Sequence, residues 1–374
     1  MTDAVRVATP DELAGWDRLT VDVPGGQVLQ SRAWARHRAT TGWLAHHLVC
    51  GDGRAVLALE RPFPVVGGSR AYLPRGPVAA GDSVEQVAGR LAAVTGWLAA
   101  RGADVVTTDA ELTLGSGYGV RLESLGFHAV DDVQPARHRM SLAIHGGEDE
   151  VLAGVAKQTR QRIRSAETEG VAIRRFDAAA AAGPGDGFAP GPVERLPEAL
   201  ATFHAMVRAT GERRGFQLGP VGPFLAWLTA AHAAGLAIYL EARLADRGSR
   251  GEAAAASSPI AGLLVYRQGD RLSTAISGDN AAARSAHPGV LHLLRWRAIQ
   301  LAIREGRSEM DLGGVDVAGA RHEPQPGEPI HGLYQHKRSF GAVFVEQVGA
   351  HERVLRPWHF RLARAAGRLA GRLR

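Results

Sequence analysis

The alternation of apolar and polar positions predicts the same order of elements twice along the chain. The first series contains two strands, a helix and a third strand, at residues 55–60, 70–73, 84–100 and 105–108. The second series contains a hairpin, a helix and a short strand, at residues 260–266, 272–276, 290–304 and up to Asp311. Each helix is followed by a glycine, and each series closes on an aspartate. This repeat is typical of a tandem duplication of one α/β unit.

The length of 374 residues exceeds one ordinary domain, so two domains are expected. Gly146-Gly147 interrupts the pattern and places the boundary within residues 143–149. Two segments rich in small residues, residues 178–192 and 246–258, are predicted to be surface loops.

The composition is that of a globular protein, with 45% hydrophobic and 22% charged residues. Basic residues outnumber acidic ones by 44 to 38, which is compatible with RNA, a phospho-sugar or a membrane surface as partner. The single cysteine, Cys50, excludes an intramolecular disulfide. The N-terminus lacks the features of a signal peptide, and no apolar run approaches the ~20 residues that span a bilayer. A cytoplasmic protein is therefore expected.

The segment 331–341, which contains Lys337, is the strongest candidate for chemistry. It follows Asp311-Leu312-Gly313-Gly314, and it sets a lysine among aromatic rings and glycines. Element interiors disfavour that density of glycine. A cation in such a setting suits a polyanionic or carbonyl-bearing ligand.

Other kinds of catalytic site leave no trace in the sequence. The histidines are scattered, and the pair His46-His47 points to opposite faces of one element, so no metal site is predicted. No nucleophile elbow and no phosphate-binding P-loop occurs.

Six motifs follow one another along the chain. They are Val28-Leu29-Gln30-Ser31 with Trp34 and Gly42-Trp43, the hairpin from Leu59 to Pro77, the basic helix from Thr159 to Val171, Glu212-Arg213-Arg214-Gly215-Phe216, Asp311-Leu312-Gly313-Gly314, and the segment around Lys337. In this order they resemble the motifs of the Fem family, the aminoacyl-tRNA-dependent aminoacyltransferases that build peptidoglycan cross-bridges.

The resemblance implies two tandem acetyltransferase-like (GNAT-like) α/β domains. Domain 1 would comprise residues 1–145, completed by the returning residues 345–374, and domain 2 residues 146–344. Some relatives carry a long helical arm in the second domain. No extended heptad pattern occurs here, so no coiled-coil arm is expected.

The resemblance also implies catalytic roles. Lys337 would stabilise the oxyanion and the leaving group when an amine attacks the ester carbonyl of an aminoacyl-tRNA. Asp109 matches an aspartate considered as general base, although it is equally interpreted as a helix N-cap before Leu112. His336, where many relatives have Phe, would stack on the terminal adenine, titrate near neutrality, or only fill the aromatic position.

Acceptor contacts are implied at three further places. Arg38 corresponds to a lysine that binds acceptor phosphates in relatives, and Arg213, with Arg214 as its rival, to an acceptor-binding arginine. Asp311, Gly313 and Gly314 would let a ligand approach the backbone, unless Asp311 only holds its own loop. The acceptor-binding tyrosines of relatives are missing, which leaves the identity of the acceptor open.

Three basic residues, Lys157, Arg160 and Arg164, fall on one face of the predicted basic helix. They would follow the phosphates of the tRNA, or they form an ordinary solvated face.

The sequence therefore predicts transfer of an amino acid from aminoacyl-tRNA to an amine of a peptidoglycan precursor, either lipid II or UDP-MurNAc-pentapeptide, without a further cofactor. An acyl-CoA-dependent N-acyltransferase is the nearest alternative, but no Gln/Arg-x-x-Gly-x-Gly/Ala loop for the pyrophosphate is found. A tRNA-dependent enzyme acting on a peptide natural product and a non-catalytic RNA-binding protein are the others. The sequence does not indicate an oligomeric state.

The C-terminal residues 354–374 combine Trp358, Phe360 and leucines with arginines, a composition suited to an anionic membrane surface. The alternative is that Trp358 and Phe360 pack onto the first domain. The two interpretations can hold together if the membrane-facing part begins at Arg361.

Overall fold

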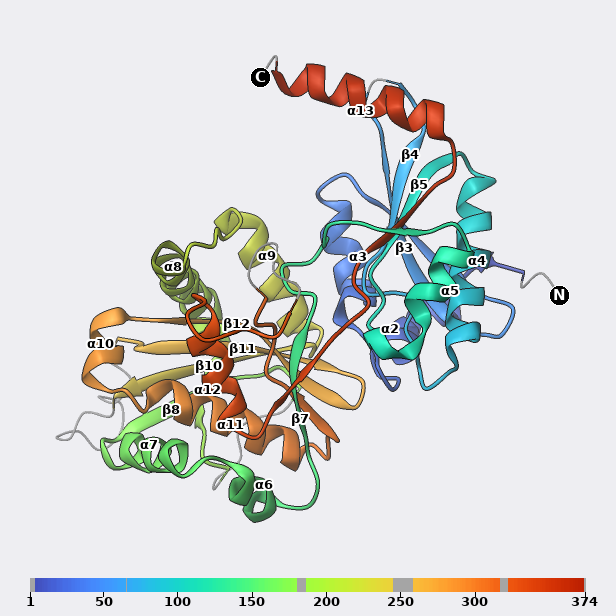
Figure 1. The fold of residues 1–374 in the computed structure, drawn as a ribbon. Coiled ribbons are helices and arrows are strands. Elements are labelled where there is room, and N and C mark those ends of the chain that lie inside the picture. Colours follow the sequence, from blue (N-terminus) through green and yellow to red (C-terminus); the bar gives the residue numbers. More distant parts are fainter. Residues whose placement is uncertain (1–3, 65, 180–185, 245–257, 317–321, 373–374) are drawn as a thin grey trace. The chain divides into compact units, whose positions relative to one another are not determined.

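The computed structural model describes residues 4–64, 66–179, 186–244, 258–316 and 322–372, and the side chains up to residue 367 (Figure 1). The chain forms two compact units. Unit 1 comprises Met1–His138, Gln268–Asp270 and Val345–Arg374, and unit 2 comprises Arg139–Arg267 and Arg271–Phe344. Large parts of the two predicted surface loops, residues 180–185 and 246–257, lie outside the described residues.

The described residues of unit 1 form a seven-stranded sheet in the order β1-β2-β3-β4-β5-β15-β6. Its strands are β1 Arg6–Val7, β2 Leu44–Val49, β3 Ala55–Pro62, β4 Ser69–Leu73, β5 Ala103–Thr108, β6 His128–Ala129 and β15 His351–Val354. Its helices are α1 Pro10–Ala14, α2 Trp16–Thr20, α3 Arg32–Ala39, α4 Val84–Ala99, α5 Tyr118–Ser124 and α13 Pro357–Arg372. β4 and β5 are parallel, and β15 pairs with both β5 and β6, so the returning chain completes this sheet.

Helix α4 shows how the local sequence builds this unit. Ser83 and Gln86 form a capping box at its N-terminus. Its apolar residues recur at helical spacing and are buried against the sheet, namely Val87, Leu91, Val94 and Leu98.

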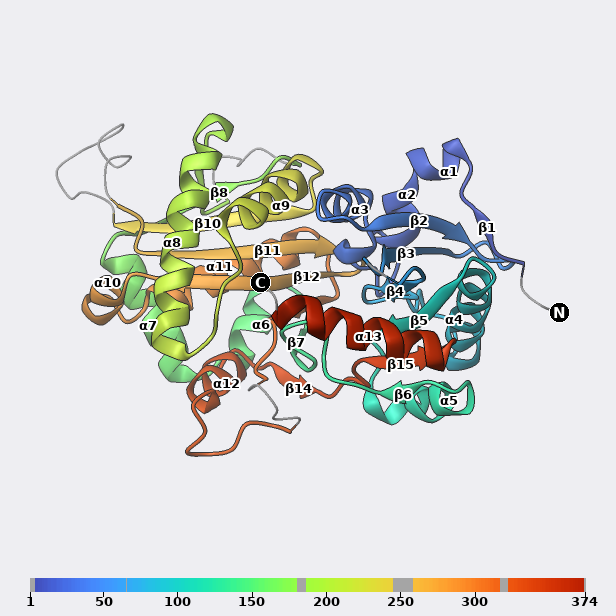
Figure 2. The ribbon, with the colours of Figure 1, turned by 90° about the horizontal axis from the view of Figure 1, so that it is seen from above.

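The described residues of unit 2 form an eight-stranded sheet in the order β14-β7-β13-β12-β11-β10-β8-β9. Its strands are β7 Arg139–Ala143, β8 Val171–Phe176, β9 Ala189–Pro190, β10 Ala237–Leu244, β11 Ala261–Gln268, β12 Arg271–Asp279, β13 Glu309–Asp311 and β14 Val343–Val345. Its helices are α6 Glu148–Gly154, α7 Lys157–Thr168, α8 Leu196–Arg214, α9 Val221–Ala233, α10 Ala281–Ala286, α11 Val290–Arg304 and α12 His331–Arg338. Helices α8 and α9 lie on one face of the sheet, and α7 and α11 on the other (Figures 1 and 2).

The centre of this second sheet positions the candidate site. β12 and β13 are parallel and pair only from Arg271 to Ser273 and from Glu309 to Asp311. β12 then continues to Asp279, whereas β13 ends at Asp311. The two strands therefore separate beyond Asp311. Side chains of α11 and α12 can reach the backbone groups that follow in each strand.

The structure confirms the predicted α/β class and the repeated order of elements. The predicted helix at residues 290–304 is α11, and the predicted hairpin is β11 and β12. The boundary lies earlier than residues 143–149, because β7 pairs with β13 and so belongs to unit 2. In the described part of unit 2 the longest helix is α8, with 19 residues, and it packs on β12 rather than forming an arm.

The start of α13 is held on unit 1 by Asp104. The buried carboxylate of Asp104 lies 2.7 Å from Arg356 Nε and 2.9 Å from His359 Nδ1. The ring of Phe360 lies near that of Phe63, but Trp358 is 82% exposed. The expectation that Trp358 packs onto the first domain is therefore wrong, because the anchoring contacts come from its polar neighbours. No described helix has the length and apolarity needed to cross a bilayer.

Candidate functional site

Lys337 on α12 is buried at the point where β12 and β13 part. Its side chain is only 4% exposed, and Nζ donates a hydrogen bond of 2.6 Å to the carbonyl oxygen of Gly314. Burial, followed by the nearby charge of Arg295, holds its pKa well below the ordinary 10.5, while Asp311 acts in the opposite direction. Lys337 is buried because α12 packs its last turn into the unit.

Asp311 shapes the backbone that receives this lysine. Its carboxylate accepts the N–H of Gly313 at 2.7 Å. Gly313 has a φ of +80°, and a Cβ there would lie 2.8 Å from the carbonyl oxygen of Thr274. Glycine is thus required by both conformation and space. The structure places Asp311 as the residue that ties this loop, which was one of its two predicted interpretations.

His336 is part of a cluster of rings. Its Nδ1 lies 3.2 Å from Nε2 of His292, and its ring meets those of His292 and Phe340 edge-on. Burial, and then the charge of Arg295, lower its pKa well below 6.5. Titration near neutrality, one of the predicted roles, is therefore wrong.

The tautomer of His336 follows from its neighbours. Arg162 Nη1 lies 3.4 Å from Nε2 of His292, and an arginine can only donate. The same nitrogen of His292 must therefore accept from Nδ1–H of His336. The other ring nitrogen of His336, Nε2, is buried without a hydrogen-bond partner and keeps its lone pair.

Arg295 on α11 is the most unusual residue that sequence reasoning missed. It is 4% exposed, and no described residue forms a hydrogen bond or ion pair with it. Burial lowers its pKa from 12.5 to about 10. Together with His336, Ser277 and several leucines it lines a cavity of about 40 Å³. The helical spacing in the sequence does indicate that Arg295 is buried, because Arg295 falls on the apolar face that includes Leu291 and Leu294.

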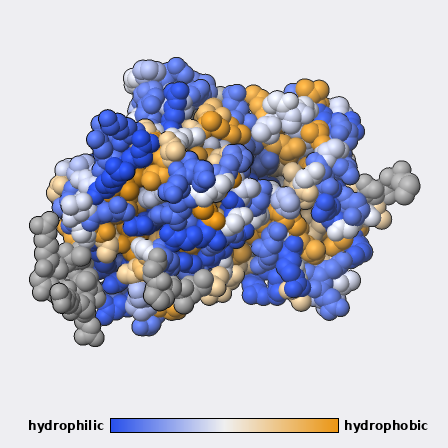
Figure 3. All heavy atoms as spheres, turned by 90° about the horizontal axis from the view of Figure 1, so that it is seen from below, coloured by the Kyte–Doolittle hydropathy of each residue, from blue (hydrophilic) through white to orange (hydrophobic). Residues whose placement is uncertain are grey.

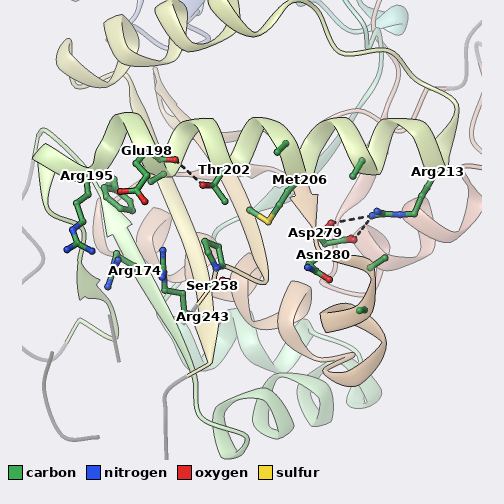
Figure 4. Close-up of a pocket in the computed structure, with 17 residues that line it drawn as sticks. Arg174, Arg195, Glu198, Thr202, Met206, Arg213, Arg243, Ser258, Asp279 and Asn280 are labelled. Atoms are coloured by element: carbon green, nitrogen blue, oxygen red, sulfur yellow. Dashed lines mark hydrogen bonds and ion pairs between the residues drawn. The ribbon is translucent and has the colours of Figure 1, made fainter. Parts of the chain in front are cut away.

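A larger pocket of about 720 Å³ lies along α8 (Figure 4). At one end Arg213 donates to the carboxylate of Asp279 at 2.5 Å. At the other end three arginines gather, Arg174, Arg195 and Arg243. Arg214, the predicted rival of Arg213, is exposed and does not line this pocket.

The buried Glu241 lies among the arginines of this pocket. Arg243 Nε is 2.5 Å and Arg174 Nη1 4.0 Å from the same carboxylate oxygen. Burial, and then the charge of Arg243, lower the pKa of Arg174. Positive charge is therefore in excess at this end, which suits an anionic ligand.

Of the three basic residues predicted on one face of α7, Arg160 is already engaged in hydrogen bonds within the protein. Arg160 Nη1 donates to the carbonyl oxygens of Val155 at 2.5 Å and Ala153 at 3.2 Å, so it caps the end of α6. Lys157 and Arg164 are exposed. Figure 3 views the side on which α6 and α7 lie in Figure 1, and hydrophilic residues predominate there among smaller apolar areas.

In unit 1, Arg38 belongs to a group of three arginines around one indole. The guanidinium carbons of Arg38, Arg70 and Arg61 lie 5.1, 5.4 and 6.0 Å from the ring centre of Trp43. Trp34 also faces Arg38, at 5.4 Å.

These three arginines, which we call the Trp43 arginine cluster, lack an acidic partner. No carboxylate among the described residues forms an ion pair with any of them. Arg61 and Arg70 stand directly opposite each other on β3 and β4, an arrangement that repels without an anion. Burial, and then the charge of Arg61, lower the pKa values of Arg38 and Arg70. The sequence indicated Arg38 and missed the cross-strand pair.

Asp109 closes β5 and is buried, with both carboxylate oxygens engaged. One accepts from the Tyr72 hydroxyl at 2.9 Å and the other from the N–H of Arg75 at 2.6 Å. Burial is the main cause that raises its pKa. The N-cap interpretation is wrong, because the short 3₁₀ helix that follows begins after Thr113. The geometry favours Asp109 as an anchor of the strand end over its predicted role as a base.

The described residues contain no group of three metal-ligating side chains. Comparison with known proteins gives a consistent assignment. Residues 153–338 match the model of the acetyltransferase (GNAT) domain family. The lipid II:glycine glycyltransferase of Staphylococcus aureus is 26% identical over 207 residues, which cover 52% of this chain and 44% of that protein. The chain thus spans somewhat under half the length of the curated relatives it matches.

Solved structures show the same fold along almost the whole chain. A crystal structure of FemX superposes with a TM-score of 0.73 at 18% identity, covering 96% of this chain and 99% of that one. The structure of L-PGS from Bacillus licheniformis has a TM-score of 0.51 at 11% identity, covering 96% and 97%. The domain match, the sequence match and the shared fold agree with the resemblance of the motifs to the Fem family.

Proposed function

We propose that this chain transfers an amino acid from an aminoacyl-tRNA to an amine of a peptidoglycan precursor. The likeness to lipid II:glycine glycyltransferases supports the reaction class. The observation that carries the proposal is the buried Lys337, fixed on Gly314 where the central strands of a GNAT-type sheet part.

In the proposed step, the acceptor nitrogen forms a bond to the ester carbonyl carbon and the carbon–oxygen bond to the ribose breaks. The proton lost by the amine balances the one gained by the ribose oxygen. Protonated Lys337 stabilises the oxyanion and then the leaving oxygen, and its buried position strengthens both interactions.

We assign the acceptor's phosphates to the Trp43 arginine cluster of unit 1. Three guanidinium groups without an acidic partner among the described residues suit a diphosphate, because each can donate to phosphate in a forked geometry. In unit 2, the pocket along α8 supplies an anion-binding surface through Arg174, Arg195 and Arg243. Arg213 keeps its predicted acceptor role, oriented by Asp279.

The direct test is a transfer assay with the full chain. A panel of charged tRNAs is combined with either lipid II or UDP-MurNAc-pentapeptide, and mass spectrometry records the acceptor. A gain of one amino-acid residue supports the proposal and names the residue transferred. No mass gain with any charged tRNA contradicts it.

A pH dependence is expected from Lys337. Transfer requires its protonated form, so kcat/KM should fall as pH rises through its depressed pKa, well below the ordinary 10.5. Lys337→Arg keeps a charge over this range and should lack that fall. Identical alkaline profiles for the two proteins would remove Lys337 from the proton-dependent step.

The tRNA surface is expected to involve Lys157 and Arg164 of α7, since Arg160 is engaged elsewhere. Each phosphate contact contributes about −0.9 to the slope of log affinity against log salt. The double charge reversal Lys157→Glu, Arg164→Glu should therefore flatten this slope by about two. Arg208→Glu, at an exposed position of α8, is the control. An unchanged slope in the double variant would show that this face is only solvated.

We also propose that α13 binds an anionic membrane surface through exposed Trp358 and Leu362 beside Arg361 and Arg364. The double variant Trp358→Ser, Leu362→Ser should no longer co-sediment with phosphatidylglycerol vesicles. Neither the wild type nor the double variant should co-sediment with neutral vesicles. Leu114→Ser removes an equally exposed leucine elsewhere and serves as control. Equal sedimentation of the wild type and the double variant would contradict this role.

A further inference from the structure

The cavity near Lys337 contains an arginine whose charge no described residue compensates. Arg295 is 4% exposed and has neither a hydrogen bond nor an ion pair with any described residue. A buried ion without a partner loses several kcal/mol of hydration. Packing does not require a guanidinium there, because the remaining walls of the cavity are mostly leucine, namely Leu263, Leu291, Leu294 and Leu333. A ligand that supplies the missing anion would explain why a charged residue occupies this position.

The other polar groups of the cavity narrow down the ligand. The Ser277 side chain can donate, and His336 Nε2, as argued above, can only accept. The cavity therefore offers a guanidinium group that can donate two parallel hydrogen bonds, a hydroxyl group, and one ring nitrogen that accepts a hydrogen bond. An oxyanion next to a hydroxyl matches this set, and the volume of about 40 Å³ accommodates a single such group.

The position relative to Lys337 indicates which part of a substrate arrives here. Arg295 and His336 line the same cavity, and the charge of Arg295 lowers the pKa of both His336 and its neighbour Lys337, so Arg295 lies near both side chains. Lys337 is assigned to the reacting carbonyl. An anion bound by Arg295 therefore belongs to the acyl donor and lies close to its reactive end. In a nucleotide-based donor that anion is a phosphate.

We propose that Arg295 is the ligand of a phosphate group of the acyl donor, in the cavity that it shares with Ser277 and His336. This inference rests on the proposed acyl transfer but not on the identity of the donor. The 3′-terminal nucleotide of a tRNA fits this position, because its phosphate and a ribose hydroxyl lie close to the ester. In coenzyme A the pantetheine arm separates the phosphates from the thioester, and coenzyme A is the alternative source that the test distinguishes.

The test compares the full-length wild type with Arg295→Met, which has similar length and no charge. Arg208→Met is the matched control, because it removes one exposed arginine of the same unit. Fluorescence anisotropy and calorimetry measure binding of two probes, an RNA hairpin with a 3′-amide-linked amino acid and coenzyme A. The variant Arg295→Met should bind one of them at least about 10-fold more weakly, the range expected for a lost charged hydrogen bond.

Stability separates a ligand-binding arginine from a structural one. If Arg295 serves to bind an anionic ligand and does not stabilise the fold, Arg295→Met should raise the Tm of the ligand-free protein by about 2 °C or more, because the buried charge is removed. If Arg295 holds the fold together, Tm should fall.

A second measurement does not depend on the variant. A methylphosphonate at the terminal phosphodiester of the hairpin removes the oxyanion charge. It should weaken binding to the wild type about 10-fold and add little to the effect of Arg295→Met.

The outcomes are separable. Weakened RNA binding supports both this inference and the tRNA-dependent reaction. Weakened binding of coenzyme A alone supports the inference and contradicts tRNA as donor. The inference is overturned if Arg295→Met binds both probes like the wild type, if neither probe binds the wild type, or if the variant is destabilised.

Discussion

Replacing Lys337 with methionine is expected to reduce the rate of aminoacyl transfer by about 100-fold or more, which is typical for the loss of one group that stabilises an oxyanion. Methionine is the appropriate replacement because Lys337 is buried, and alanine would leave a cavity. Single-turnover transfer with a saturating charged tRNA measures the chemical step.

The stability of this variant should not fall. Because the pKa of Lys337 in the folded state lies below 10.5, its buried ammonium destabilises the fold. This destabilisation is complete below the folded-state pKa, and it disappears as pH rises to the pKa of this lysine in the unfolded chain. Methionine removes the penalty, although the Gly314 carbonyl loses its donor. Arg208→Met, at an exposed position of α8, is the control. Near-normal transfer by Lys337→Met would remove its catalytic role, and loss of folding would make it a structural lysine.

The second large effect is expected in unit 1. The double variant Arg61→Gln, Arg70→Gln should raise the KM for an acceptor bearing a diphosphate by about 100-fold or more, since each lost charged hydrogen bond contributes about 1.5–3 kcal/mol. Because the two residues face each other as like charges, the fold itself should be slightly stabilised. Steady-state kinetics with UDP-MurNAc-pentapeptide measures the change.

The matched comparison uses an acceptor without phosphates. The free stem peptide should react equally slowly with the wild type and the double variant. Arg121→Gln, an exposed arginine of α5 that contacts only Ser124 among the described residues, should leave both KM values unchanged. If the double variant retains the wild-type KM for the diphosphate acceptor, the Trp43 arginine cluster does not bind its phosphates.

The order of elements could be predicted from the sequence because it depends on local pattern. The apolar spacing of α11 and the glycine after it define a helix whatever its surroundings. The domain boundary was placed too late because β7 is short and its partner β13 is distant in sequence. Pairing over such a distance leaves no local signal.

The candidate site was predictable only where a motif marked it. Lys337 and Arg38 were found through their motifs, but the burial of Lys337 depends on how α12 packs. Arg295 was missed because an arginine on an apolar helical face is usually interpreted as an exposed interruption. The partners of Arg38, namely Arg61 and Arg70, become neighbours only through the register of β3 and β4. These features arise from tertiary packing and strand register, which single-sequence patterns do not specify.

The dependence of transfer on tRNA can be measured with the full chain. The full chain is incubated with a mixture of charged tRNAs and UDP-MurNAc-pentapeptide, with and without prior ribonuclease treatment, and in parallel with an acyl-CoA mixture. We expect the acceptor to gain the mass of an amino-acid residue only with intact tRNA. A mass gain that survives ribonuclease, or one that appears only with acyl-CoA, would contradict it.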